Sequence, residues 1–237
     1  MNEVTIVMAY YENPGMLRLH LDEWKKYDPI YGHVRFLIVD DGSTDSPALD
    51  VVRKHGACRI DLMLFRVLED RPWGQDAARN IGMHHAQTDW VLLTDMDHMV
   101  NTDQIATLMR FEPTRKTYYM PNRVCRGEPK HPHPNSFLFH RRDFWDMGGY
   151  DEDFVGFYGS DGNFRKCAKG AGLIEKQMAD FYLYEFTTDE IPDANTRKYS
   201  RKEGEYYAAS NPALEEKRRG TPYRASNPLR LPYERVL

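Results

Sequence analysis

The hydrophobic positions of the first hundred residues fall into short, uninterrupted runs separated by longer amphipathic segments. The runs have the length of strands that are buried on both faces of a sheet. They occupy residues 4–10, 34–39 and 62–68, and a fourth run begins at Trp90. The segments between them, 14–27, 47–55 and 75–86, have the start signals and composition of helices; before the first, Asn13 and Pro14 supply an N-cap and a first helical residue. This alternation predicts an α/β fold with a mostly parallel sheet flanked by helices.

The second half of the chain has a less regular pattern. It predicts helices at 102–110, 141–147 and 161–169 and strands at 117–120, 136–140, 173–177 and 181–186. Residues 123–135 contain Gly127 and three prolines, so we expect a loop that is long enough to have a function. From Asp189 onward the chain is polar and rich in proline, which predicts a few short helices and an extended tail rather than a second core. We therefore expect one domain at 1–188 and a C-terminal extension at 189–237.

The composition is that of a soluble globular protein. The chain has 237 residues, of which 41% are hydrophobic and 29% charged. No run approaches the ~18 apolar residues of a membrane span, and the N-terminus has no secretory signal pattern. Cys58, Cys125 and Cys167 are widely spaced and odd in number, so we expect free thiols in a reducing compartment and a cytoplasmic protein.

The net charge of −4 is unevenly distributed. Between Arg197 and Leu237 ten basic residues face five acidic ones, so this segment carries +5 and the rest of the chain carries −9. A negative main body argues against broad electrostatic binding to nucleic acid. The basic extension could contact an anionic acceptor, a membrane surface or another subunit, or could simply be solvated.

Two carboxylates, Asp95 and Asp97, follow the fourth apolar run and are separated by one residue. In open α/β sheets ligands bind beyond the carboxyl ends of such strands. A pair of hard oxygen ligands there could hold Mg²⁺ or Mn²⁺. The alternative is that one aspartate caps the helix that starts near Thr102, or that both are solvated.

Four motifs, in order, make the chain similar to glycosyltransferase family 2, whose members have the Rossmann-like GT-A fold. They are Val-Asp-Asp-Gly-Ser-Thr-Asp at 39–45, Ala-Ala-Arg-Asn-Ile-Gly at 77–82, Asp-Met-Asp at 95–97, and Gly-Gly-Tyr-Asp-Glu at 148–152 followed by Gly-Ser-Asp at 159–161. The resemblance spans residues 4–186. It implies a nucleotide-sugar-binding half at 1–97 and an acceptor-binding half at 98–188.

The resemblance also implies residues for the donor. Asp40 or Asp41 would accept a hydrogen bond from the nucleotide base, in a pocket lined by Ala9 and Tyr10. Arg79 would contact the pyrophosphate or orient Asp95. These roles compete with simpler ones, since an Asp-Gly pair also makes a turn and an arginine on a helix also makes surface ion pairs.

For the metal, the family pattern places Asp95 near the ribose and Asp97 on the ion. Asp95 and His98 are further candidate ligands. His131 and His133 lie in the long loop; either could be a ligand, but we interpret both as solvated loop residues.

For the chemistry, the resemblance implies Asp161 as the base that deprotonates the acceptor hydroxyl. A helix N-terminus would lower its basicity unless burial offsets that effect. Ser160 stands where the family usually has a glutamate that holds the acceptor, so Ser160 is a candidate acceptor contact and the acceptor class stays open. Tyr158 and Asp151, on the glycine-rich aromatic and acidic segment, are candidate acceptor contacts, because rings stack on sugar faces and carboxylates accept from hydroxyls.

The sequence thus predicts a metal-dependent hexosyl- or N-acetylhexosaminyltransferase. We expect its donor to be a nucleotide sugar, in particular a UDP-sugar, and the transfer to invert the configuration at the anomeric carbon. Rival interpretations are a retaining enzyme resembling polypeptide N-acetylgalactosaminyltransferases and a non-catalytic sugar-nucleotide-binding protein. A nucleotidylyltransferase is disfavoured, because residues 10–13 lack a glycine-rich basic loop after the first strand. The acceptor, whether a saccharide, glycolipid, protein or modified base, and the oligomeric state stay open.

Overall fold

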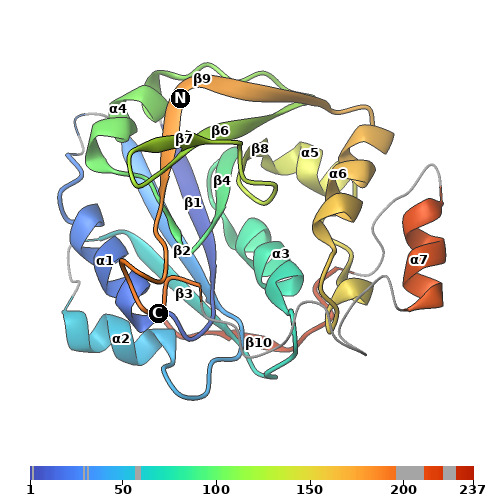
Figure 1. Ribbon diagram of the computed structural model, residues 1–237, viewed down its shortest axis with the longest axis horizontal. Helices are drawn as coiled ribbons and strands as arrows, with labels where there is room; N and C mark the ends of the chain where they lie inside the picture. Colours follow the sequence, from blue (N-terminus) through green and yellow to red (C-terminus); the bar gives the residue numbers. More distant parts are fainter. Residues whose placement is uncertain (2, 29, 31, 57–59, 196–210, 221–227) are drawn as a thin grey trace.

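The computed structural model describes residues 1–237 apart from 2, 29, 31, 57–59, 196–210 and 221–227. The strands it describes form one sheet in the order β10-β3-β2-β1-β4-β8-β6-β9-β5, with β7 paired to β6. Helices cover both faces of this sheet (Figure 1). The first half consists of β3 (Leu62–Val67), β2 (His33–Asp40), β1 (Glu3–Tyr10) and β4 (Trp90–Asp95).

These four strands are parallel, as the continuous apolar runs predict. The register sets Tyr10 of β1 opposite Asp40 of β2, and Ala9 opposite Asp95 of β4. The carboxyl ends of the three strands therefore meet at one edge of the sheet. This is the edge at which open α/β sheets bind ligands.

Two apolar layers hold the helices against the sheet. The helices α1 (Pro14–Trp24), α2 (Ala48–His55) and α4 (Thr102–Arg110) pack on one face. The helices α3 (Gln75–His85), α5 (Arg141–Asp146) and α6 (Asp161–Gly170) pack on the other. Helix α3 lies so close to β1 that a Cβ on Gly82 would stand 2.3 Å from Cγ1 of Val7. Only glycine permits this close packing of the C-terminal part of α3 against β1.

The second half of the sheet is mixed and corrects two predictions. Its strands are β8 (Phe137–His140), β6 (Thr117–Cys125), β7 (Glu128–Lys130), β9 (Ile174–Glu185) and β5 (His98–Met99). The segment predicted as a loop, 123–135, begins with a β6–β7 hairpin that turns at Arg126 and Gly127, both with positive φ. The strands predicted at 173–177 and 181–186 are one strand, β9, which pairs with β6 across a register shift between Met120 and Asn122.

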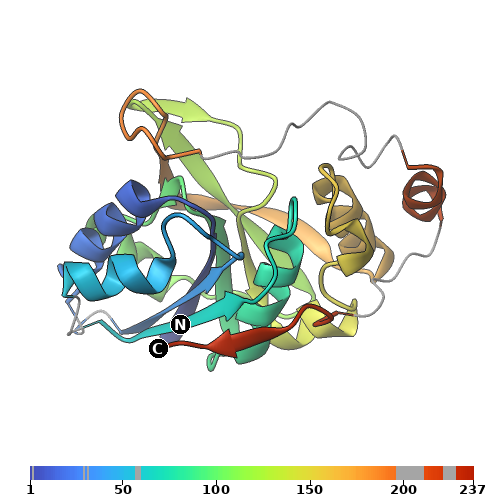
Figure 2. The same ribbon diagram turned by 90° about the horizontal axis from the view of Figure 1, so that it is seen from below.

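The described parts of the C-terminal segment are attached to the rest of the molecule. Strand β10 (Tyr233–Arg235) pairs antiparallel with β3 at the sheet edge, which Figure 2 shows from below. The prediction of an extended tail is therefore wrong for these residues. Helix α7 (Pro212–Arg219) packs Leu214 against Phe154. The division at residue 189 stays a prediction.

The segment after β9 also caps α1. The side chain of Asp193 accepts hydrogen bonds from the backbone N–H groups of Gly15 and Met16, the second at 3.0 Å. Asn13 occupies the N-cap position, but its side chain makes no capping bond to the helix. The sequence therefore predicted the correct N-cap position, but the carboxylate that caps the helix belongs to Asp193, 180 residues after Asn13 in the chain. The side-chain amide of Asn13 donates to the backbone carbonyl of Asp193.

The thiols of Cys125 and Cys167 are free and buried, and Cys58 lies outside the described residues. Among the helices that are described, none is both long and apolar enough to cross a membrane. The cytoplasmic location stays a prediction from the cysteines.

Candidate functional site

A cleft of about 410 Å³ opens at the carboxyl ends of β1, β2 and β4. Segments far apart in the sequence form its walls: the strand ends, the loop before α3, the loop before β8, the start of α6 and the chain after β9. Among the residues that line it are Ala9, Tyr10, Asp41, Trp73, Asp95, Asp97, His133, Asn135, Tyr158, Asp161 and Ala194. Seven of the twelve residues that the sequence suggests for the site are in this lining: Ala9, Tyr10, Asp41, Asp95, Asp97, Tyr158 and Asp161.

The structure separates the two aspartates at the end of β2. Asp40 accepts hydrogen bonds from the backbone N–H groups of Ser43 and Ala48, each at 2.8 Å, so it ties the strand end to α2. Asp41 lines the cleft, and its Oδ1 atom has no hydrogen-bond partner among the residues that the structure describes. Burial, together with the nearby charges of Asp40 and Asp70, raises the pKa of Asp41 well above its ordinary value. Asp41 is thus the carboxyl group available to a ligand.

Arg79 on α3 holds the carboxylate of Asp95. Its side chain is 1% exposed, and its Nη2 donates to Oδ1 of Asp95 while its guanidinium lies 5.3 Å from the ring centre of Tyr150. Burial alone would raise the pKa of Asp95, but Arg79, His133 and His98 outweigh it and lower that pKa. Of the two roles considered for Arg79, orienting Asp95 matches this geometry, because its side chain is not part of the described cleft wall.

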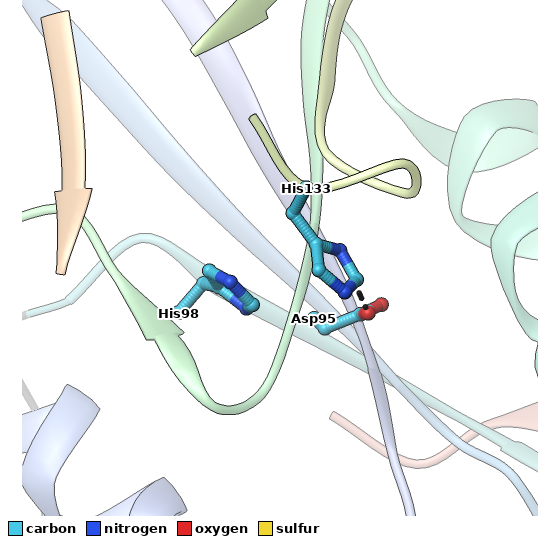
Figure 3. A group of neighbouring side chains, drawn as sticks. All are labelled: Asp95, His98 and His133. Carbon is cyan, nitrogen blue, oxygen red and sulfur yellow. Dashed lines mark ion pairs between the residues drawn. The ribbon is translucent and has the colours of Figure 1, made fainter. Parts of the chain in front are cut away.

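Asp95, His98 and His133 form a group that could bind a metal ion, with one potential ligand atom from each within 4.8 Å of the others (Figure 3). Nδ1 of His133 lies 3.4 Å from Oδ2 of Asp95, and the two imidazole centres are 4.5 Å apart. The prediction of a solvated His133 is wrong: the loop turns it into the cleft, where it is 21% exposed. His131, two residues earlier, is exposed as predicted.

Asp97, the metal ligand in the family pattern, has a different contact. Its Oδ1 lies 2.7 Å from Nδ1 of His98, whose side chain is fully buried. Burial opposes a charge on His98, but the hydrogen bond and charge of Asp97 outweigh that effect and raise the pKa of His98. Nε2 of His98 has no hydrogen-bond partner within the described part of the chain.

Asp161 is the first residue of α6 and lines the cleft. Burial is the largest influence on its carboxyl group and raises its pKa; Arg79 opposes this rise, whereas Asp95 adds to it. Asn135, on the opposite loop, donates a hydrogen bond to it. Burial therefore outweighs the groups that lower the pKa of Asp161, and a raised pKa makes its carboxylate a stronger base.

The three predicted acceptor contacts divide between the cleft and the interior. Tyr158 lines the cleft, and the centre of its ring lies 5.0 Å from the centre of the Trp73 ring. Ser160 is buried and hydrogen-bonds to the side chain of Asp76. Asp151 is buried and forms an ion pair with Lys217 at 2.7 Å. The structure therefore brings Tyr158 to the cleft but places Ser160 and Asp151 outside its described lining.

Sequence reasoning missed several cleft residues. Trp73 precedes α3, Asn135 follows the hairpin, and Ala194 comes from the segment after β9. For the loop that carries Asn135 and His133, the signal in the sequence was the pair of prolines at 132 and 134, because prolines restrict the backbone of a loop.

Comparison with known proteins places these features in a family. The family model described as Glycosyl transferase family 2 matches residues 5–168. A search of curated protein sequences gives no match.

Solved structures with the GT-A fold resemble this chain, which confirms the predicted fold. The mannosyltransferase PcManGT from Pyrobaculum calidifontis, in complex with GDP-Man and Mn²⁺, has a TM-score of 0.60 and 18% identity, over 77% of this chain and 56% of that one. S. aureus TarS 1–349 gives 0.64 and 16%, over 81% and 63%. Its complex with UDP-GlcNAc gives 0.60 and 17%, over 87% and 60%. This chain thus spans less than two thirds of the length of these proteins.

Proposed function

Because this chain belongs to glycosyltransferase family 2, we propose that it transfers a sugar from a nucleotide-sugar donor, preferably a UDP-sugar, to an acceptor hydroxyl. The observation that carries the proposal is that three separate motifs converge on one cleft. Asp41, Asp95 and Asp161 lie far apart in the sequence, yet all three line the same space at the strand ends. A base-binding carboxyl, a diphosphate site and a general base are the parts that this transfer needs.

In this proposal the donor base lies near Asp41. The unpartnered Oδ1 of Asp41 can accept a hydrogen bond from the ring N–H of uracil, in a pocket that Ala9 and Tyr10 also line. Asp40 would act indirectly, because both its oxygens already bind backbone N–H groups. One similar structure is a complex with GDP-Man and another with UDP-GlcNAc, so the donor panel below includes both bases.

The residues present fit a divalent cation such as Mn²⁺ or Mg²⁺. The cleft has carboxylate and imidazole donors beside the strand ends, and one buried imidazole nitrogen has no partner within the part of the chain described. When bound, such an ion would neutralise charge on the diphosphate leaving group. Arg79 would keep Asp95 ionised and correctly oriented.

Asp161 would take the proton of the acceptor hydroxyl. Glycosyl transfer has an oxocarbenium-like transition state, and in an inverting enzyme a carboxylate base activates the nucleophile on the face opposite the leaving group. The raised pKa of Asp161 supports this role, because a more basic carboxylate accepts the proton more readily. Tyr158 and Trp73 offer aromatic faces for a sugar ring.

The test is release of free nucleotide from a panel of UDP-, GDP- and TDP-sugars, with Mn²⁺ and with a chelator. We expect slow metal-dependent release from one donor and faster release when the correct acceptor is present. Asp161→Asn should abolish transfer but preserve donor binding, whereas Asp41→Asn should weaken donor binding. Undiminished transfer by Asp161→Asn would eliminate Asp161 as the base, and a product with retained anomeric configuration would favour the retaining alternative. Absence of donor binding and release would favour a non-catalytic protein.

A further inference from the structure

The orientation of His98 indicates that this side chain is a ligand. Its Nδ1 is engaged by Asp97 at 2.7 Å, and the ring is fully buried. A carboxylate on one imidazole nitrogen fixes the tautomer, so that the lone pair of the other nitrogen is available to a metal. That other nitrogen, Nε2, has no hydrogen-bond partner in the described structure. A buried polar atom without a partner is costly unless a bound group satisfies it.

His133 is held opposite by its loop. Nε of Arg123 donates to the carbonyl of His131 at 3.0 Å, which fixes the start of the loop. At its other end the hydroxyl of Ser136 lies 3.1 Å from that of Thr94 on β4. The loop is thus fixed on both sides of His133, and Figure 3 shows the His133 ring directed at Asp95. The position of this imidazole is a property of the hairpin path, not of a free surface side chain.

Asp95 completes the metal-binding group, whereas Asp97 contacts His98 instead of the space between these three side chains. One oxygen of Asp95 is bound by Arg79 and the other faces His133. We propose that Asp95, His98 and His133 bind the divalent cation of this cleft, and that Asp97 orients His98 through their hydrogen bond instead of binding the ion. The role of this ion in sugar transfer rests on the proposed function, whereas the choice of its ligands rests on the geometry. The assignment differs from the family pattern, in which the second aspartate is the ligand.

This donor set has a consequence for metal preference. Mg²⁺ favours oxygen ligands and retains several waters, whereas imidazole nitrogen favours transition metals. Two imidazoles and one carboxylate therefore select Mn²⁺, Co²⁺ or Zn²⁺ over Mg²⁺. Three protein ligands also leave coordination positions for oxygens of a donor diphosphate.

The experiment is a titration of metal-free protein with Mn²⁺ alone, followed by electron paramagnetic resonance, with pulsed measurements to detect nitrogen coupled to the bound ion. We expect one site with nitrogen couplings from imidazole, and Mn²⁺ should stay bound in a large excess of Mg²⁺. His133→Ala should weaken Mn²⁺ binding about tenfold or more and reduce the nitrogen coupling. The matched control is His131→Ala, which removes an exposed imidazole two residues away in the same loop and should leave Mn²⁺ binding unchanged.

Asp97→Asn separates the two assignments. As a positioning change it should weaken Mn²⁺ binding by about 10- to 100-fold at most and preserve the nitrogen couplings of the ion that still binds. Bound Mn²⁺ without nitrogen coupling would overturn the proposal. So would a His133→Ala variant that binds Mn²⁺ as tightly as the unchanged protein, or a protein that binds no Mn²⁺ whether UDP is absent or present. Donor turnover without nitrogen coupling would refute this inference alone. Nitrogen-coupled Mn²⁺ without any donor binding would refute the proposed function alone.

Discussion

Replacing Arg79 with methionine tests whether the site depends on one buried ion pair. Arg79 is 1% exposed and Asp95 is 23% exposed, so the carboxylate would lose its partner in a largely dry position. Removing one member of a buried pair costs about 3–5 kcal/mol of folding stability. We expect the lower end, about 3 kcal/mol, because Asp95 reaches some solvent and His133 stays 3.4 Å away.

A double-mutant cycle isolates the interaction. Asp95→Asn alone should also destabilise the protein, because it leaves the guanidinium without its charged partner. The double variant should be more stable than the sum of the single effects predicts, with a coupling energy of about 2 kcal/mol or more. The control is the exposed pair of Arg71 and Glu69, 56% and 42% exposed, whose coupling should be below about 1 kcal/mol.

The assay is urea-induced unfolding near neutral pH in the presence of a chelator, which removes any contribution of bound metal to stability. Additive effects of Arg79→Met and Asp95→Asn would refute the reasoning, because they would mean that the two charges are independently solvated. Coupling no larger than that of the exposed control pair would have the same meaning.

Three further predictions concern basicity and packing. Burial raises the pKa of Asp161 above its ordinary value, so kcat/KM should fall as the pH decreases through that raised pKa and the base becomes protonated; a pH profile with no such acidic limb would contradict its role. Gly82→Ala should destabilise the fold in thermal unfolding by up to about 2 kcal/mol, since overpacking against Val7 costs about 1–3 kcal/mol and the helix gain offsets only about 1 kcal/mol. The control is Gly162→Ala, because a Cβ at Gly162 would lie 3.9 Å from Nη2 of Arg218; this variant should be as stable as the unchanged protein or more stable. Equal destabilisation by both substitutions would contradict the close packing of α3 on β1. Asp193→Ala should cost about 1 kcal/mol in urea unfolding by removing the cap of α1, and an unchanged midpoint would contradict that cap.

The alternation of apolar runs and amphipathic segments was sufficient to predict the parallel half of the sheet. Strand burial on both faces gives a continuous apolar signal, and each run from 4–10 to Trp90 became a strand in the expected place. Because parallel strands end at a common edge, Asp41 and Asp95, which stand at the ends of two of these runs, line the same cleft. The mixed half was harder, since β7 is a short, exposed strand whose pairing depends on a turn at Arg126 and Gly127 rather than on hydrophobic period.

What only the tertiary structure decided is which polar groups satisfy each other. Adjacent residues in one motif received different tasks: Asp40 binds backbone at the start of α2 while Asp41 faces the cleft, and Asp97 engages His98. His133 is 38 positions from Asp95 in the sequence, and no period or spacing links them. Periodicity reports burial of apolar surface, which is local and repetitive. Hydrogen bonds and ion pairs are short-range and directional, so they depend on where the hairpin, α3 and the segment after β9 bring side chains together.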